Sequence, residues 1–229
     1  MNNTFETIIV NRHLLINDGR GNMLIDTGSP ASFHVESQIH IGEDSHMVPT
    51  TYMGTTIQYL SQKVGCEIVG LIGMDILCQY TVWINTPQCG NFISFSKGDT
   101  IPSTYPVESF TIMSIPGICM KVNGQRAKLL FDTGAHISYI SDSYYQNIPI
   151  ARQSADFSPL LNAEFNVDLY NLPTHFYDKM VNIEFGSMPL ELKAMMLQLH
   201  VDGIVGYDFI QHFRIVLDKG IVKIPPQGI

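Results

Sequence analysis

The stretch "LLFDTGAHIS", residues 129–138, places Asp132 at the end of an apolar run and directly before a Thr-Gly pair. Burying a carboxylate is costly unless the group is paired. The acid therefore either marks a strand that simply ends or stands there to do chemistry. A second stretch, "MLIDTGSPAS" at 23–32, has Asp26 in the same position. The two stretches have to be interpreted together.

The chain repeats itself around these two acids. Asn17 precedes Asp26 by the same distance as Asn123 precedes Asp132. Further on, "VGLIGMDIL" at 69–77 matches "DGIVGYDFI" at 202–210, and a hairpin pattern follows each. Each half thus has the same order: hairpin, Asp-Thr-Gly, variable middle, apolar-apolar-Gly, short helical turn and final hairpin. The variable middle is longer in the second half.

Short runs rich in Val, Ile, Thr, Phe and Tyr alternate with turn residues, as in "ETIIVN", "TVWIN" and "NFISFS". This pattern predicts β-strands and hairpins, with little helix. The stretch "SKGDTIPSTYPVES" at 96–109 has the Pro, Ser and Thr density of a linker. We therefore expect an all-β chain of two pseudo-symmetric lobes, residues 1–100 and 101–229.

Composition excludes several classes of function. The chain has 229 residues, of which 45% are hydrophobic and 15% charged, with a net charge of −8. Nucleic-acid binding needs clustered Lys and Arg, and the sequence has no basic run. It also has neither the roughly 18 consecutive apolar residues of a membrane span nor a signal-peptide pattern. We expect a cytoplasmic protein with no nucleic-acid or membrane partner.

The potential metal and disulfide residues follow no known spacing. The four cysteines are Cys66, Cys78, Cys89 and Cys119, and no two of them form a CxxC pair. Free thiols in a reducing cytosol are the expectation, with a Cys78–Cys89 pairing as the alternative. The scattered histidines match no zinc pattern. We expect no metal and no cofactor.

Two Asp-Thr-Gly copies, each after an apolar strand and each followed by an apolar-apolar-Gly segment, resemble the aspartic proteases of the pepsin and retropepsin clan. The resemblance covers nearly the whole chain. In size and in motifs such as "VNGQRAKLLFDTGA" and "GLIGMDIL", each half looks like a retropepsin monomer. The resemblance implies two retropepsin-like lobes fused in one chain, with a cleft between them. Such a monomer needs no second copy for activity.

Physical chemistry supports the same interpretation. Two carboxylates about 3 Å apart cannot both ionise, so Asp26 and Asp132 would share a proton. The ionised partner would activate a water, and the protonated partner would donate to the scissile carbonyl. This predicts an aspartic endopeptidase for extended peptide or protein substrates, with apolar residues flanking the cut. A catalytically silent peptide-binding module, or a scaffold whose lobes pair with other chains, remains the alternative.

The residues around the acids have expected supporting roles. Gly28 and Gly134 permit a close approach of two loops that a β-carbon would forbid. The resemblance gives Thr27 and Thr133 the role of bonding the opposite loop. The alternative is that both acids only cap turns.

The loops differ after the motif, where Ser29 stands in one and Ala135 in the other. By resemblance to pepsins, the Ser29 hydroxyl would donate to Asp26 and favour its charged form. The hypothesis is that Asp26 holds the charge and Asp132 the proton. Asp75 and Asp208 follow the later glycines, and the expected role there is N-capping or loop anchoring.

Proteases of this clan close a flap over the substrate. The longer second half predicts the main flap within 157–179, with Tyr170, Phe176 or Tyr177 near the acids. The alternative is that these aromatic residues belong to the core. A competing flap lies at "VPTTYMGTT", residues 48–56, with Tyr52 on its strand.

Overall fold

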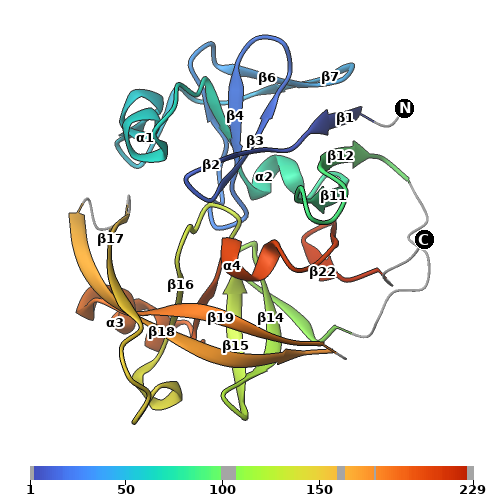
Figure 1. Ribbon diagram of the computed structural model, residues 1–229. Helices are drawn as coiled ribbons and strands as arrows, with labels where there is room; N and C mark the ends of the chain where they lie inside the picture. Colours follow the sequence, from blue (N-terminus) through green and yellow to red (C-terminus); the bar gives the residue numbers. More distant parts are fainter. Residues whose placement is uncertain (1–2, 99–106, 159–162, 178, 226–229) are drawn as a thin grey trace.

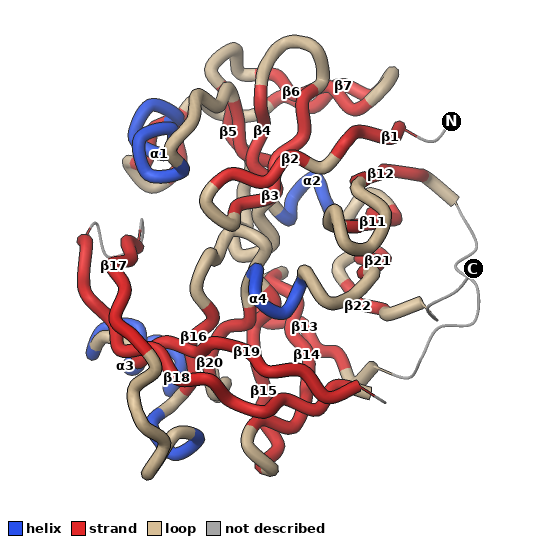
Figure 2. The backbone as a smooth tube through the Cα atoms, in the orientation of Figure 1, coloured by secondary structure: helices blue, strands red, loops and turns tan. Residues whose placement is uncertain are grey.

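The computed structural model describes residues 3–98, 107–158, 163–177 and 179–225 (Figure 1). Strands dominate these residues, with few and short helices (Figure 2). The all-β prediction is confirmed. No helix among the described residues is long and apolar enough to span a membrane. The four cysteines are free thiols.

The first half builds a five-stranded sheet in the order β2-β3-β4-β10-β5, two small hairpins and two helices. The sheet strands are β2 (Ile8–Val10), β3 (His13–Asn17), β4 (Asn22–Ile25), β10 (Gly70–Ile72) and β5 (Phe33–His34). The hairpins are β6 (Gln38–Ile41) with β7 (Asp44–Met47), and β8 (Thr51–Tyr52) with β9 (Thr55–Thr56). The helices are α1 (Ile57–Val64) and α2 (Met74–Leu77).

The second half builds an eight-stranded sheet in the order β13-β14-β15-β20-β16-β19-β18-β17. Its strands are β13 (Ser109–Ile112), β14 (Ile115–Val122), β15 (Gln125–Phe131), β16 (Ser138–Ile140), β17 (Arg152–Ser158), β18 (Ala163–Phe176), β19 (Lys179–Ser187) and β20 (Gly203–Val205). Its helices are the 3₁₀ turn η1 (Asp142–Tyr144), α3 (Leu190–Gln198) and α4 (Tyr207–Ile210).

A third sheet joins the two halves, in the order β1-β12-β11-β21-β22. It consists of β1 (Asn3–Glu6), β12 (Phe92–Ser96), β11 (Thr81–Asn85), β21 (Ile215–Asp218) and β22 (Ile221–Lys223). Strands β11 and β21 pair antiparallel, so the last hairpin of the chain completes a sheet begun by the first half. The expected boundary at residue 100 falls within 99–106, outside the described residues, and the division into lobes stays a prediction.

Both halves place their Asp-Thr-Gly loop in the same way. Strand β4 runs parallel to β10, with Ile25 opposite Ile72, and β15 runs parallel to β20, with Phe131 opposite Val205. These four residues are fully buried in one core that spans both halves. Each acid therefore comes directly after a strand that the core holds in place.

Helix α1 was not expected from the sequence. Thr56 caps it by accepting a hydrogen bond from the Tyr59 N–H at 3.1 Å, and Gly65 ends it with a φ of 85°. Its apolar side, including Leu60 and Val64, is buried against the first sheet. The helix occupies the part of the first half that follows the proposed competing flap.

Candidate active site

The two Asp-Thr-Gly loops lie against each other. Thr27 and Thr133, which are 106 residues apart in the sequence, form hydrogen bonds across this contact. A β-carbon on Gly28 would lie 2.2 Å from Asp132 Oδ2, and one on Gly134 would lie 2.6 Å from Asp26 Cγ. No real β-carbon tolerates such contacts. The glycines therefore allow each loop to reach the carboxyl group of the other.

Thr27 and Thr133 tie the loops together through symmetric hydrogen bonds. The Thr27 hydroxyl donates to the Phe131 carbonyl at 2.7 Å and accepts from the Thr133 N–H at 2.9 Å. The Thr133 hydroxyl donates to the Ile25 carbonyl at 2.7 Å and accepts from the Thr27 N–H at 3.0 Å. Both side chains are fully buried. Each hydroxyl thus satisfies two backbone groups of the interior, which fixes the spacing of the two acids.

Backbone amides hold each carboxyl group from its own loop. Asp26 Oδ1 accepts from the N–H groups of Gly28 at 2.9 Å and Ser29 at 3.0 Å. Asp132 Oδ1 accepts from the corresponding N–H groups, Gly134 at 2.8 Å and Ala135 at 3.2 Å. Each carboxyl group keeps its second oxygen for other partners. The two acids are equivalent in their local geometry.

Burial raises the pKa of both acids, and the pKa of Asp26 lies well above its usual range. The charge of Asp132 and a hydrogen bond between the carboxyl groups raise the pKa of Asp26 further. The same bond lowers the pKa of Asp132. The two acids therefore titrate as one coupled pair that holds a shared proton.

This arrangement corrects the hypothesis about Ser29. Its hydroxyl donates to the Ala31 carbonyl at 2.8 Å. The Ser29 group that donates a hydrogen bond to the Asp26 carboxyl group is its backbone N–H. The difference between Ser29 and Ala135 therefore does not place the charge on Asp26.

The residues that follow the two apolar-apolar-Gly segments hold the Asp-Thr-Gly loops in place. The Met74 N–H donates to the Ser29 carbonyl at 2.8 Å, and the Tyr207 N–H donates to the Ala135 carbonyl at 3.0 Å. These bonds join the start of each short helix to the fourth residue of each motif. The two halves again use the same construction.

The N-capping prediction for Asp75 and Asp208 is wrong, because the caps of α2 and α4 are Gly73 and Gly206. Asp75 instead accepts a hydrogen bond from Ser32 Oγ at 2.5 Å. Asp208 forms an ion pair with Arg12 at 3.2 Å. Loop anchoring, the other expected role, describes both residues.

A long hairpin of β17 and β18 projects from the second half towards α1, on the left in Figure 1. Its described residues touch the first half. The rings of Phe157 and Tyr59 meet edge to face with centroids 6.4 Å apart, and Lys63 forms an ion pair with Glu164. The turn that ends the hairpin, 159–162, lies outside the described residues. The hairpin thus joins the two halves at a second place.

The aromatic residues predicted for the flap lie elsewhere on β18. Phe176 is 3% exposed and packs edge to face on Phe209 and Phe213, with centroids 4.9 and 5.4 Å away. Tyr170 stacks on Tyr145 at 4.1 Å. Tyr177 is half-exposed and follows the end of β18 that pairs with the start of β19. The core alternative therefore holds for Phe176, and none of the three lies at the α1 end of the hairpin.

Tyr52 lies on β8 and is half-buried against the apolar cluster that contains Leu60. The strand has two residues and pairs with an equally short β9. The turn between them has Met53 at a φ of 48° and Gly54 at a φ of 80°. The predicted competing flap is thus a very short hairpin that leads into α1.

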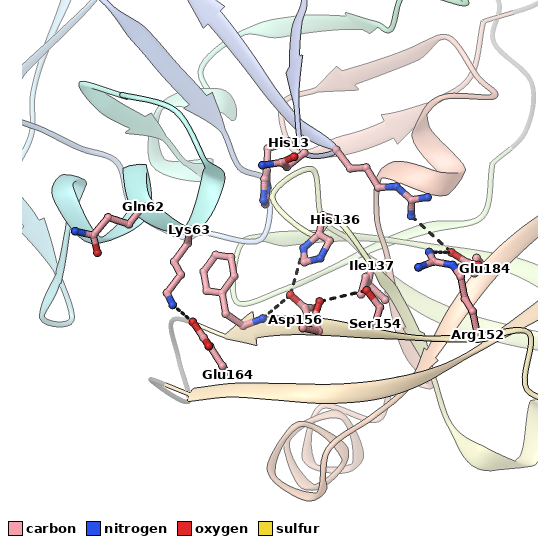
Figure 3. A pocket seen from close by; sticks show the side chains of 14 residues that line it. His13, Gln62, Lys63, His136, Ile137, Arg152, Ser154, Asp156, Glu164 and Glu184 are labelled. Carbon is pink, nitrogen blue, oxygen red and sulfur yellow. Dashed lines mark hydrogen bonds and ion pairs between the residues drawn. The ribbon is translucent and has the colours of Figure 1, made fainter.

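A cavity of about 820 Å³ lies between the hairpin, α1 and the Asp-Thr-Gly loop of the second half (Figure 3). His136 follows Ala135 in that loop, and its Nδ1 lies 3.2 Å from Asp156 Oδ1 on β17. The ring of His13, from β3, packs against the ring of His136 with centroids 5.5 Å apart. Tyr139 donates a hydrogen bond to Asp156.

Sequence reasoning missed this cluster. Burial and the neighbouring His136 lower the pKa of His13 to about 4, although a backbone hydrogen bond with Gly134 opposes the shift. Burial raises the pKa of Asp156. The only signal in the sequence was the position of His136, directly after the motif.

No family model matches the chain, and no curated protein matches it in sequence. Among solved structures, the chain is similar to the EIAV protease complexed with the inhibitor HBY-793, with a TM-score of 0.29 and 16% identity. The similar region covers 43% of this chain and 86% of that chain.

Proposed function

We propose that this chain is an aspartic endopeptidase that hydrolyses peptide bonds with a water held between Asp26 and Asp132. The observation that carries the proposal is the reciprocal placement of the two loops. Each Asp-Thr-Gly loop sets its glycine against the other acid, and the threonines fix this arrangement from the interior. A turn-capping acid needs no such partner from the other half of the chain.

In the proposed mechanism one acid is charged and the other is protonated, and each has its own role. Charged Asp132 takes a proton from the water, whose oxygen attacks the scissile carbonyl carbon. Protonated Asp26 donates its proton to the carbonyl oxygen, giving a tetrahedral gem-diol. Collapse of this intermediate breaks the C–N bond, and Asp132 passes its proton to the leaving nitrogen. One of the two hydroxyl groups of the gem-diol returns its proton to Asp26, which restores the starting state.

The substrate in this proposal is an extended peptide or a protein segment. The hairpin of β17 and β18, held against α1 by Phe157 and Glu164, would cover it and exclude water. Both acids come from one chain, so the active unit would need no second copy. No cofactor enters any step.

Cleavage of a peptide library, followed by mass spectrometry from acidic to neutral pH, tests the proposal. Wild type should cut peptides, whereas Asp26→Asn and Asp132→Asn should not. Asp142→Asn is the matched control and should retain activity, because Asp142 lies on the surface, where it pairs with Lys193 and accepts a hydrogen bond from the Tyr145 hydroxyl. Library binding without cleavage by wild type at any pH would favour the silent peptide-binding module instead.

A further inference from the structure

The hairpin of β17 and β18 projects beyond the strand that supports it. Strand β18 pairs with β19 only from Leu169 to Phe176, whereas it pairs with β17 over residues 163–169. Among the described strands, the projecting part of the hairpin therefore has no sheet neighbour outside the hairpin itself. Side-chain contacts have to fix its position against the rest of the protein.

Asp156 is a buried charged residue of this projecting part. Its side chain is 7% exposed, although β17 is the edge strand of its sheet. One carboxyl oxygen accepts a hydrogen bond from the Tyr139 hydroxyl. The other accepts from the Phe157 N–H at 2.6 Å and lies 3.2 Å from His136 Nδ1 (Figure 3). Burial raises the pKa of Asp156, and these three partners oppose the rise.

Two of these partners come from the segment that directly follows the second acid. His136 is next to Ala135, whose N–H donates to the Asp132 carboxyl group at 3.2 Å. Tyr139 lies on β16, and its ring packs on Phe165, the β18 residue paired with Asp156, with centroids 6.5 Å apart. Tyr139 thus contacts both strands of the hairpin. These contacts connect the hairpin to the loop that holds Asp132.

The first half of the chain carries different residues at the two corresponding positions. Pro30 stands where the second half has His136, and Phe33 stands where it has Tyr139. The correspondence is structural, since Phe33 pairs with β10 as Tyr139 pairs with β20. Proline has no polar side chain, and phenylalanine lacks the hydroxyl that bonds Asp156. Both polar partners therefore occur in the half that carries the long hairpin.

Stability alone does not account for this arrangement. A buried, paired charge is often no more stabilising than apolar side chains of similar volume. An apolar residue at position 156 would pack against Tyr139 and Phe165 without removing a charge from water. What the carboxylate adds is direction, because its hydrogen bonds fix the distance and orientation of β17 relative to the loop.

We propose that Asp156 is a positioning residue, which acts through Tyr139 and His136 to hold the hairpin of β17 and β18 at a fixed distance from the two acids. This proposal rests on the proposed protease function, in which the hairpin covers the bound peptide. A covering hairpin contacts the peptide before the reaction and during it alike. Loosening the hairpin therefore weakens peptide binding and raises KM, with little change in kcat.

Tyr139→Phe tests this role, because it removes the hydroxyl and keeps the ring. KM for a cleaved peptide should rise about 10-fold, with kcat within about 3-fold of wild type. Tyr144→Phe is the matched control. Tyr144 is 4% exposed, like Tyr139, and its hydroxyl donates at 2.7 Å to the Arg126 carbonyl on β15 rather than to the hairpin.

The control should lose stability in urea but keep the wild-type KM. An unchanged KM in Tyr139→Phe, an equal rise in the control, or a lowered kcat at unchanged KM would overturn the proposal.

A double-mutant cycle shows whether Tyr139 acts through Asp156. Asp156→Asn removes the charge and keeps one oxygen as an acceptor. Combined with Tyr139→Phe, it should raise KM no more than the larger of the two single changes does. Effects that multiply would mean independent roles and would overturn the assignment. If urea unfolding shows that Asp156→Asn is unfolded, His136→Gln takes its place in the cycle, with the same expectation.

Calorimetry with a library peptide separates this proposal from the protease function. In the Asp132→Asn background, Tyr139→Phe should weaken peptide binding about 10-fold, whereas Tyr144→Phe should not. This selective weakening combined with an inactive wild type would contradict only the protease function. Cleavage by wild type combined with equal binding by both variants would contradict only the role of Asp156.

Discussion

Thr27 and Thr133 exchange backbone contacts between the two halves of the chain, each hydroxyl accepting from the N–H of the other residue at 2.9–3.0 Å. Each hydroxyl also donates at 2.7 Å to a carbonyl of the opposite strand, at Phe131 or Ile25. The exchange joins the ends of two core strands directly beside Asp26 and Asp132. Under the proposed function, the four bonds that stabilise the interior would also hold the two acids in place.

Thr133→Val should destabilise the protein by about 2–4 kcal/mol. The substitution leaves the Ile25 carbonyl and the Thr27 N–H buried without their partner, and valine keeps the shape of the side chain. Urea unfolding measures the change. Thr51→Val on exposed β8 is the control and should stay within about 0.5 kcal/mol of wild type. Equal effects at the two positions would contradict the structural role of the exchange.

Gly28→Ala should abolish peptide cleavage, because the new β-carbon would lie 2.2 Å from Asp132 Oδ2 and push the acids apart. The matched control is Gly124→Ala. Gly124 has a φ of 78° but nothing within 4 Å, so this change should cost about 1 kcal/mol and leave activity intact. Cleavage assays on folded samples of both variants measure whether Gly28→Ala loses activity while Gly124→Ala retains it. An active Gly28→Ala protein is incompatible with the contact.

Asp26→Asn should make the protein more stable than wild type as the pH rises. The folded pKa of Asp26 lies above its ordinary value of 3.8, so the unfolded chain releases this proton at a lower pH than the folded chain does. The stability contributed by the raised pKa is complete below 3.8 and is lost as the pH climbs through the folded pKa. Asn carries no titrating proton and shows no such loss.

Urea unfolding across this pH range, with Asp142→Asn as the control, tests that dependence. The stability difference between Asp26→Asn and wild type should grow with pH. A difference that does not change with pH would mean that the pKa of Asp26 is not raised.

Ser29→Ala should leave the acidic limb of the pH–rate profile unchanged. The hydroxyl donates to the Ala31 carbonyl, so its removal takes no hydrogen bond from the Asp26 carboxyl group. The pH dependence of kcat/KM for one peptide, compared with wild type, is the measurement. A shifted acidic limb would restore the hypothesis that Ser29 stabilises a charged Asp26.

The two acids could be predicted from sequence because the information is local and occurs twice. Asp26 and Asp132 each follow an apolar strand, and the small residues after them permit only a tight loop. Helix α1 could also have been found, since Thr56 and Gly65 are ordinary capping signals at its two ends. It was missed because the sequence on both sides is rich in strand-forming residues, so its three buried apolar positions were not recognised as a helical pattern.

Other parts of the site depend on the tertiary fold. The sequence of an alternating strand such as β18 does not reveal which of its aromatic residues enters the core. Phe176 is buried because Phe209 and Phe213, from near the end of the chain, pack against it. His13 and Asp156 lie far apart in sequence, and His136 is placed between them only by the fold. No spacing rule reports such a cluster.

The most direct test of the shared-proton dyad is the kcat/KM of wild type, Asp26→Asn and Asp132→Asn for one cleaved peptide, from acidic to neutral pH. The account predicts cleavage by wild type and a loss of about 10²–10⁴-fold or more in each variant, since each removes one half of the acid–base pair. Cleavage by either variant at the wild-type rate, or none by wild type at any pH, would contradict it.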